Sequence, residues 1–250
     1  MDAQSVTAYP LVADVPALNT FLNRVFGGEE KVRAVGSAGG FHTEVQIGDT
    51  TVMAGGGGEG VSWNGRPAPM AFHIYVPDVD AAYQRAIAEG ARSLQAPADQ
   101  EWGERTANIA DPAGNFWYIA TFQGENYFSE GAPTVQPFLQ PVRSEPLIDF
   151  LVKAFGAEEM GRAATHDGTV LHTTLKIGNS AMEMFDANSI YQPMPGMFVL
   201  SVGDADAAYR RALEHGAESI FPPADQPQGD RMGGVKDLAG NSWYIAHRIR

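Results

Sequence analysis

The second half of this chain repeats the first half. One repeated stretch is FLNRVFGGEE (Phe21 to Glu30), which returns as FLVKAFGAEE (Phe150 to Glu159). Another is DVDAAYQRAIAEGA from Asp78, which returns as DADAAYRRALEHGA from Asp204. A third is PADQEWGERTANIADPAGNFWYIA, which returns as PADQPQGDRMGGVKDLAGNSWYIA. Self-similarity in a fixed order indicates two copies of one domain. It also allows residues kept in both copies to be told apart from residues changed in one.

The composition is typical of a water-soluble globular protein. Of its residues, 44% are hydrophobic and 19% are charged. A length of 250 residues allows two domains that each bury a core. No apolar run is long enough to span a bilayer, and the first residues lack the basic start and apolar stretch of a secretory signal. Cysteine is absent, which excludes disulfides, thiolate metal ligands and cysteine nucleophiles. We therefore expect a cytoplasmic protein.

The charge argues against nucleic acid as a partner. The formal net charge is −13, and basic residues cluster only in the closing HRIR. A protein that binds DNA or RNA backbones neutralises phosphates with many cations, whereas this surface would repel them. We expect neither nucleic acid nor a membrane as a partner.

Four segments have the apolar spacing of a helix that buries one face. Carboxylates suited to capping precede three of these segments, and a glycine follows each of the four. The predicted helices contain Leu18 to Val25, Val79 to Ala86, Leu147 to Ala154 and Ala205 to Ala212, with the carboxylates Asp14, Asp78 and Asp204 and the glycines Gly27, Gly90, Gly156 and Gly216.

Strand-like runs lie before and after each predicted helix. The preceding runs are Val6 to Val12, Ala71 to Val76, Val135 to Val142 and Met197 to Val202. Two-residue links that contain glycine predict tight hairpins between Phe41 to Ile47 and Thr50 to Ala54, and between Leu171 to Ile177 and Ser180 to Phe185. The predicted repeating unit is a strand, a helix and about three strands, four times over.

The polar segment 123–134 predicts the boundary between the two copies. The first predicted domain is 1–122, with modules 1–60 and 66–122, and the second is 135–250, with modules 135–190 and 195–250. The stretch from Ala54 to Gly65 predicts a flexible connector, because its AGGGGEG core lacks the Gly-Lys-Ser/Thr ending of a phosphate-binding loop.

Four βαβββ modules in tandem pairs resemble the vicinal-oxygen-chelate superfamily, which holds glyoxalase I, bleomycin-resistance proteins and extradiol dioxygenases. The resemblance is closest to an uncharacterised glyoxalase-like subgroup, in a tandem two-domain form. The motifs that carry it are FGGEE and FGAEE, FHTEVQIGD and LHTTLKIGN, EWGER and QGDR, and DPAGNFW and DLAGNSW. The resemblance implies an α+β fold of two glyoxalase-like domains, in which two modules form an open barrel-like cup with helices outside.

Metal-dependent members of this superfamily hold an ion in the cup with a His or Gln, a Glu, a His and a Glu. The resemblance places at these positions Thr7, Met53, Ala71 and Tyr118 in the first copy, and Gln136, Glu183, Met197 and Tyr244 in the second. Thioether, methyl and phenol groups do not suit Zn²⁺ or Ni²⁺, so we expect no metal in the first cup. In the second copy only Gln136 and Glu183 match the pattern.

An exchange of modules between the copies, which occurs in some relatives, offers one route to a metal site. The exchange would bring Gln136 and Glu183 opposite Ala71 and Tyr118, and His73 shares the face of Ala71. Gln136, Glu183 and His73 would then hold a divalent metal such as Zn²⁺ or Ni²⁺. Alternatively, His73 is a wall residue of the cup or a core histidine with satisfied hydrogen bonds.

Two histidines and a carboxylate are further candidates for contact with a ligand. His42 and His172 occupy equivalent places in the two copies. Each of them acts as a base or hydrogen-bond donor to the ligand, or ties its strand to a neighbouring loop. Glu183 stands among apolar residues, where a carboxylate could take a proton from carbon; alternatively, it forms a hydrogen bond with Gln136.

Arginines and aromatic residues recur near the end of each copy. Arg105 and Arg231 either bind an anionic group through the guanidinium fork or pair with a nearby acid, Glu104 or Asp237. Trp and Tyr are adjacent in the final strands, so one of each pair should face the cup and the other the helices.

We therefore expect a protein that captures a small, partly apolar organic molecule in an aromatic-lined cup, without a metal or other cofactor, as in the bleomycin-resistance branch. The expected ligand-binding residues are Gln136, His172, Met197, Tyr244, Thr7, His42, Met53, His73 and Tyr118. The alternative is a metal-dependent lyase or isomerase of glyoxalase type, with Glu183 as ligand or base. A third possibility is that one copy is only structural. The sequence allows a monomer or a homodimer.

Overall fold

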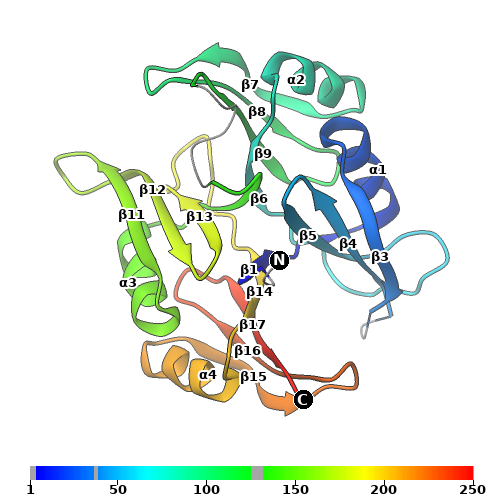
Figure 1. Ribbon diagram of the computed structural model, residues 1–250, viewed down its shortest axis with the longest axis vertical. Coiled ribbons are helices and arrows are strands. Elements are labelled where there is room, and N and C mark those ends of the chain that lie inside the picture. The colour runs from blue at the N-terminus through cyan, green and yellow to red at the C-terminus, as the bar shows by residue number, and fades with distance from the viewer. Residues whose placement is uncertain (1–3, 37–38, 125–131, 250) are drawn as a thin grey trace. The chain divides into compact units, whose positions relative to one another are not determined.

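The computed structural model describes residues 4–36, 39–124 and 132–249 (Figure 1). The chain divides into two compact units whose boundaries differ from those of the sequence repeat. The N-terminal unit is Tyr9–Pro137, and the C-terminal unit combines Met1–Ala8 with Phe138–Arg250. The first strand of each copy therefore belongs, wholly or in part, to the unit built mainly from the other copy.

The N-terminal unit has an α+β architecture. Its strands follow the orders β2-β5-β4-β3 and β6-β9-β8-β7, and α1 packs against α2 (Figure 1). The elements are β2 (Leu11–Val12), α1 (Val15–Phe26), β3 (Glu29–Val35), β4 (Phe41–Ile47), β5 (Thr50–Gly56), β6 (Ala71–Tyr75), α2 (Val79–Ala88), β7 (Arg92–Asp99), β8 (Glu104–Ala110) and β9 (Phe116–Phe122). The strands make open sheets rather than a closed barrel.

The C-terminal unit has the same architecture. Its strands follow the orders β1-β14-β17-β16-β15 and β11-β12-β13-β10, and α3 packs against α4. The elements are β1 (Val6–Ala8), the end of β10 (Val135–Leu139), α3 (Ser144–Phe155), β11 (Glu158–Ala164), β12 (Val170–Ile177), β13 (Ser180–Met184), β14 (Met197–Ser201), α4 (Ala205–Glu214), β15 (Glu218–Asp225), β16 (Asp230–Lys236) and β17 (Ser242–Arg248). The predicted strand–helix–strands module thus occurs four times.

The four predicted helices are all present, and side chains in the sequence explain most of their ends. The carboxylates of Asp14, Asp78 and Asp204 each accept a hydrogen bond from the backbone N–H three residues later. Gly27 and Gly156 end α1 and α3 in the left-handed conformation. The helix α3 has no capping side chain at its own N-cap residue. Instead, the N–H of its first residue donates to the distant carboxylate of Asp186 at 2.6 Å.

Prolines shorten two of the predicted strands. The run Val6 to Val12 is divided after Ala8, because Pro10 has no N–H for a strand ladder. The division separates β1, which pairs antiparallel with β14, from β2, which pairs parallel with β5. In the same way, the run Val135 to Val142 ends as a strand at Leu139, just before Gln140 and Pro141.

The stretch Ala54 to Gly65 is not a flexible connector along its whole length, contrary to the prediction. The strand β5 continues to Gly56, and Ala54 to Gly57 are buried. Gly56 has a φ of 139°, and a Cβ atom there would lie 1.9 Å from the carbonyl oxygen of Val12. Glycine is therefore needed for close approach of two strands. Most of the predicted boundary segment 123–134 lies outside the described residues.

The N-terminal unit anchors the start of β10 at the turn between β4 and β5. The backbone N–H of Thr134 donates to the Asp49 carboxylate at 2.7 Å, and that of Val135 donates to the Thr50 hydroxyl at 3.1 Å. Thr134 also accepts a hydrogen bond from the N–H of Tyr75 at 2.9 Å. These bonds fix the strand that begins the second copy within the N-terminal unit.

The C-terminal unit anchors β1 at the equivalent turn between β12 and β13. The backbone N–H of Ser5 donates to the side-chain oxygen of Asn179 at 2.8 Å, and that of Val6 donates to the Ser180 hydroxyl at 2.9 Å. Asn179 therefore has the role in this unit that Asp49 has in the other. The repeat has kept the anchor while changing the carboxylate to an amide.

We predict that Asp49→Asn is tolerated at pH 7, whereas Asp49→Ala costs about 1 kcal/mol, because only alanine removes the acceptor for Thr134. Burial acts to raise the pKa of Asp49, but hydrogen bonds from Thr134 and Thr50 outweigh it and lower the pKa below 3.8. The stability from this carboxylate is therefore present above that value and lost as the pH falls through the lowered pKa. Urea titrations of the three proteins at several pH values measure this, and Asp49→Asn should lack the acid-dependent loss. An equal cost for both substitutions at pH 7 would contradict the anchor.

Candidate functional site

A buried carboxylate in the C-terminal unit is held by a histidine. Glu183 on β13 has a side chain only 8% exposed, and its Oε2 atom lies 3.0 Å from Nε2 of His172 on β12, whose side chain is 48% exposed. A carboxylate taken out of water requires a partner of this kind. Because no other described residue forms a hydrogen bond with His172, its Nδ1 atom is available to a ligand.

The pairing of His172 with Glu183 is not among the sequence predictions, although the hairpin contains the signal for it. The tight turn between β12 and β13 sets a register in which Thr174 is opposite Glu183. His172 is two residues from Thr174, so it shares that face and is a diagonal neighbour of the carboxylate. The predicted hydrogen bond between Glu183 and Gln136 stays a prediction.

Aromatic rings lie beside the His172–Glu183 pair. Phe138 on β10 is the register partner of Glu183, and its ring centre lies 6.4 Å from that of His172 and 5.0 Å from that of Phe185. Tyr191 continues the group, with its ring 5.5 Å from Phe185. Phe138 follows Gln136 by two residues in the same strand, and Gln136 is buried. The C-terminal unit thus combines a polar pair and three aromatic rings.

The equivalent histidine of the N-terminal unit has different partners. Nδ1 of His42 lies 2.7 Å from the Tyr9 hydroxyl, and Nε2 lies 3.5 Å from a carboxylate oxygen of Glu44. Met53, the counterpart of Glu183, is half-buried and is the register partner of Glu44. The two copies have therefore kept the histidine and changed the polar partners of its ring.

The structure brings together two further predicted site residues of the N-terminal unit. His73 on β6 and Tyr118 on β9 are register partners on adjacent parallel strands, so their side chains share a face. His73 is buried, and its ring lies 4.6 Å from that of Tyr75. The Tyr75 hydroxyl donates to Glu104 at 2.9 Å. Burial against an aromatic ring agrees with the interpretation of His73 as a wall or core residue.

Three predicted site residues of the C-terminal unit lie on one sheet. Val199 on β14 is the register partner of both Thr7 on β1 and Tyr244 on β17, which places Thr7 and Tyr244 on one face. Met197 is two residues before Val199 and shares that face. Burial raises the pKa of the Tyr244 phenol. Phe221 packs against Tyr244, with ring centres 5.8 Å apart.

The expected alternation of Trp and Tyr in the final strands is present. Trp117 and Trp243 are fully buried and stack on Phe72 and Phe198, at 4.5 and 4.6 Å between ring centres. Trp117 also meets Phe26 at the end of α1, so the tryptophans face the helices. The neighbouring tyrosines are half-buried on the opposite face.

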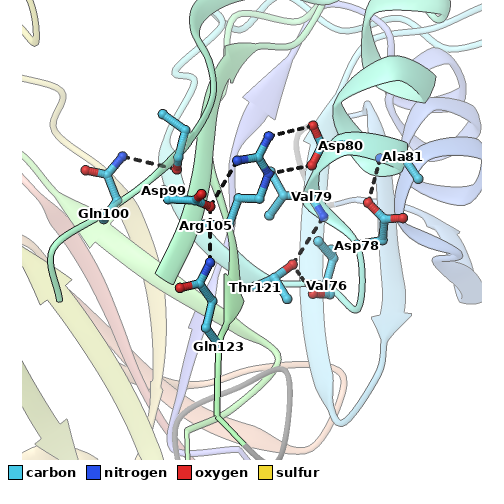
Figure 2. Close-up of polar contacts among 11 residues, drawn as sticks. Val76, Asp78, Val79, Asp80, Ala81, Asp99, Gln100, Arg105, Thr121 and Gln123 are labelled. Atoms are coloured by element: carbon cyan, nitrogen blue, oxygen red, sulfur yellow. Dashed lines mark hydrogen bonds and ion pairs between the residues drawn. The ribbon is translucent and has the colours of Figure 1, made fainter. Parts of the chain in front are cut away.

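The two recurrent arginines, Arg105 and Arg231, each form ion pairs with acidic residues, but not with the predicted ones. Figure 2 shows Arg105 between Asp80 and Asp99. Its Nε and Nη2 atoms donate to Asp80 at 2.5 and 2.9 Å, and its Nη1 atom donates to Asp99 at 3.0 Å. These bonds raise the pKa of Arg105. The predicted partner Glu104 is wrong, because adjacent residues of a strand point to opposite faces.

Arg231 repeats this arrangement in the C-terminal unit. Its guanidinium group bonds to Asp206 at 2.5 and 2.9 Å and to Asp225 at 2.7 Å. The predicted partner, Asp237, is instead buried and accepts hydrogen bonds from Asn241 and Trp243. With their forks filled by two carboxylates each, both arginines fix their loops, and this arrangement does not favour the anion-binding alternative.

A metal ion requires several donor side chains that converge on one point. Among the described residues, no three side chains of His, Cys, Asp or Glu are grouped so as to hold a metal. A catalytic zinc site takes three protein ligands, and His172 and Glu183 are only two. Gln136 and His73 belong to the N-terminal unit and Glu183 to the C-terminal unit, so their combination stays a prediction.

Comparisons with known proteins agree with the repeated fold. The model of a family described as "Glyoxalase/Bleomycin resistance protein/Dioxygenase superfamily" matches residues 10–119 and 142–245. An uncharacterized protein of Mycobacterium tuberculosis is 32% identical over 139 residues, which are 51% of this chain and 82% of that protein. No helix among the described residues is long and apolar enough to cross a membrane.

Two solved structures are similar over nearly the whole chain. Glyoxalase I from Zea mays has a TM-score of 0.75 at 15% identity, covering 97% of this chain and 92% of its own. A putative dioxygenase from Bacillus subtilis has a TM-score of 0.64 at 15% identity, with 97% and 84% covered. At these identities the likeness concerns the fold alone.

Proposed function

The chain belongs to the glyoxalase/bleomycin resistance protein/dioxygenase superfamily, and we propose that it binds a small, partly apolar organic molecule beside His172 and Glu183 without a metal ion. The observation that carries the proposal is the buried, histidine-held carboxylate next to Phe138, Phe185 and Tyr191. Sites for small molecules are commonly apolar and aromatic, with a few polar groups that orient the ligand.

The chemistry of these side chains defines the class of ligand. The rings of Phe138, Phe185 and Tyr191 favour a flat, apolar portion. His172 uses Nε2 for Glu183, so Nδ1 can exchange a hydrogen bond with a hydroxyl, carbonyl or amide group of the ligand. Because Glu183 already has His172 as a hydrogen-bond partner, the site does not need a cationic ligand.

A second candidate is the lyase or isomerase of glyoxalase type, with Glu183 as ligand or base. It is favoured by the burial of Glu183 next to a titratable histidine, since paired groups of this kind serve in proton transfer. A metal-dependent form requires donors beyond this pair, and Gln136 and His73 are the predicted ones. A bound divalent ion would supply polarisation of substrate oxygens.

Thermal denaturation with a panel of small aromatic aldehydes and amides, with bleomycin included, tests the proposal. A ligand of the folded protein at about 100 times its Kd stabilises it by about 2.7 kcal/mol, which raises the Tm by several degrees. We expect His172→Ala to weaken binding about tenfold, and Phe185→Ala to weaken it as much. Leu171→Ala is the matched control, because Leu171 is exposed and adjacent residues of a strand point to opposite faces.

Metal analysis of untagged protein separates the two candidates. Protein offered Zn²⁺ or Ni²⁺ and then dialysed should retain less than one equivalent, and Glu183→Gln should not change that amount. Stoichiometric metal that disappears in Glu183→Gln would overturn the proposal and support the metal-dependent lyase or isomerase. Binding that His172→Ala and Phe185→Ala leave intact would place the ligand elsewhere.

A further inference from the structure

Three polar side chains of the N-terminal unit, those of Tyr9, His42 and Glu44, contact one another in a row. The Tyr9 hydroxyl lies 2.7 Å from Nδ1 of His42, and Nε2 of the same ring lies 3.5 Å from Oε1 of Glu44. The side chains of His42 and Glu44 are 24% and 33% exposed, and Tyr9 is half-buried. All three side chains are therefore partly accessible to solvent. An activated nucleophile combines a group that can lose a proton, a base that takes the proton and a carboxylate that orients the base. Tyr9, His42 and Glu44 match these three parts in this order.

A glycine provides the space in which Tyr9 lies. A Cβ atom on Gly55 would be 2.8 Å from Cε2 and 3.0 Å from the hydroxyl oxygen of Tyr9. The N–H of Gly55 also donates to the carbonyl of Pro10 at 3.0 Å, which holds the backbone beside Tyr9. The tyrosine ring therefore lies directly on the β5 backbone, with its hydroxyl oxygen beside His42.

The second copy of the sequence lacks the residues that make this Tyr–His–Glu arrangement in the first copy. The C-terminal unit has Phe138 in place of Tyr9, Thr174 in place of Glu44 and Phe185 in place of Gly55. Phe138 has no hydroxyl, and Phe185 fills the space that Gly55 leaves open. His172 bonds instead to Glu183, whose counterpart in the N-terminal unit is Met53. At this position both units have a histidine beside a carboxylate, and in the N-terminal unit the histidine also contacts a phenol.

We propose that Tyr9, His42 and Glu44 form a second acid–base site, in which Tyr9 is the catalytic residue and exchanges a proton with a small neutral molecule. His42 and Glu44 are positioning residues in this site. It is distinct in chemistry from the His172–Glu183 pair, and it does not depend on the ligand proposed for that pair.

The proton transfer can be followed atom by atom. The Tyr9 hydroxyl proton moves to Nδ1 of His42, which leaves a phenoxide and an imidazolium whose positive charge faces Glu44. The phenoxide oxygen then takes a proton from a hydroxyl or an acidic C–H of the ligand and becomes a phenol again. The negative charge passes to the ligand and is stabilised by the imidazolium.

The charges of the site select its ligand class. Glu44 and the net charge of −13 disfavour an anion before proton transfer, so the ligand enters neutral. It must carry a proton acidic enough for a phenoxide to remove, as in an enol, a phenol or a carbon next to a carbonyl. Met53, beside Glu44, offers an apolar contact.

Acetylation by N-acetylimidazole tests the site without knowledge of the ligand. The phenoxide oxygen attacks the acetyl carbon and imidazole leaves, which gives O-acetyltyrosine. Hydroxylamine then removes the acetyl group and restores the tyrosine. Peptide mass spectrometry of the full chain compares the rate at Tyr9 with that at Tyr83, which is also half-buried and forms no hydrogen bond with another described residue. We expect Tyr9 to react about tenfold faster than Tyr83, and His42→Ala to remove this advantage.

Three variants keep the experiment decisive. Glu44→Gln should lower the Tyr9 rate about threefold, because it removes the charge that stabilises the imidazolium but leaves the fold intact. Tyr9→Phe should abolish labelling at position 9 only. His166→Ala is the control substitution in the other unit, because His166 is exposed, and it should leave the Tyr9 rate unchanged. The proposal is overturned if Tyr9 reacts no faster than Tyr83, or if folded His42→Ala and Glu44→Gln both label Tyr9 at the rate of the unmodified sequence.

Discussion

Val6→Asp should unfold the C-terminal unit while leaving the N-terminal unit structured, although Val6 belongs to the first copy of the sequence. Val6 is fully buried in β1, which pairs with β14, and its N–H bonds to Ser180. A carboxylate in that place would be buried without a partner. We expect a loss of about 4 kcal/mol from the C-terminal unit, near the upper end of what single substitutions cause.

The reciprocal substitution is Val135→Asp. Val135 begins the second copy of the sequence, but it is buried in the N-terminal unit, where its N–H bonds to Thr50. We expect this variant to destabilise the N-terminal unit by a similar amount, about 4 kcal/mol. Each substitution therefore acts on the unit built mainly from the other copy.

Hydrogen exchange measured by mass spectrometry reads out the two units separately. Val6→Asp should speed exchange in peptides from β14 and β17, and Val135→Asp in peptides from β4 and β5. Val35→Asp is the control, because Val35 is 70% exposed and a charge there should change neither unit. If Val6→Asp instead loosened β4 and β5 and left β14 protected, the assignment of β1 to the C-terminal unit would be wrong.

The repeat predicted the local structure well because its signals are short-range. The helix caps Asp14, Asp78 and Asp204 act on amides three residues away, and the glycine turns at Gly48 and Gly178 join neighbouring strands. Such signals need no knowledge of the rest of the fold. Four modules and an α+β architecture follow from them together with the family resemblance.

The exchange of first strands could not be predicted from the residues of those strands. β1 and β10 are both buried along their whole length, and the hairpin turns that receive them, at Asp49 and Asn179, offer almost the same acceptor. Either strand could therefore be accommodated at either turn. The choice depends on chain connectivity and long-range pairing, which periodicity does not report.

The candidate site was predicted as a set of positions but not as a set of contacts. Glu183, His172 and His42 were singled out individually, whereas the bonds of the two histidines depend on Tyr9, Glu44 and hairpin register. Tyr9 is not among the predicted site residues because the apolar run from Val6 to Val12 predicts one continuous strand. Its neighbour Pro10 was the signal that the strand breaks there.

Asp237→Asn should lower the free energy of unfolding by about 3 kcal/mol and the Tm by roughly 10 °C. One carboxylate oxygen of Asp237 accepts the backbone N–H groups of Ala239 and Asn241, both at 2.9 Å. The other accepts the Asn241 side-chain amide and the indole N–H of Trp243, both at 2.8 Å. Asparagine has only one side-chain oxygen, so its NH₂ group would face two buried donors.

The pH dependence of this cost has a definite sign. Burial raises the pKa of Asp237 above 3.8 in spite of the four hydrogen bonds. The folded protein then holds the proton more tightly than the unfolded chain, so the contribution of Asp237 is greatest below the unfolded pKa and declines as the pH rises through the folded pKa. The stability difference between the unsubstituted protein and Asp237→Asn should therefore be larger at about pH 4 than at about pH 7.

The repeat supplies a second copy of the same test. Asp111 accepts hydrogen bonds from Asn115 and Trp117 in the same geometry, and burial raises its pKa as well, so Asp111→Asn should match Asp237→Asn. Asp204→Asn is the control, because asparagine caps a helix as well as aspartate does. Urea denaturation followed by tryptophan fluorescence measures all three. A cost below about 1 kcal/mol for both buried substitutions would show that the donors find other acceptors, and that these turns do not depend on a carboxylate.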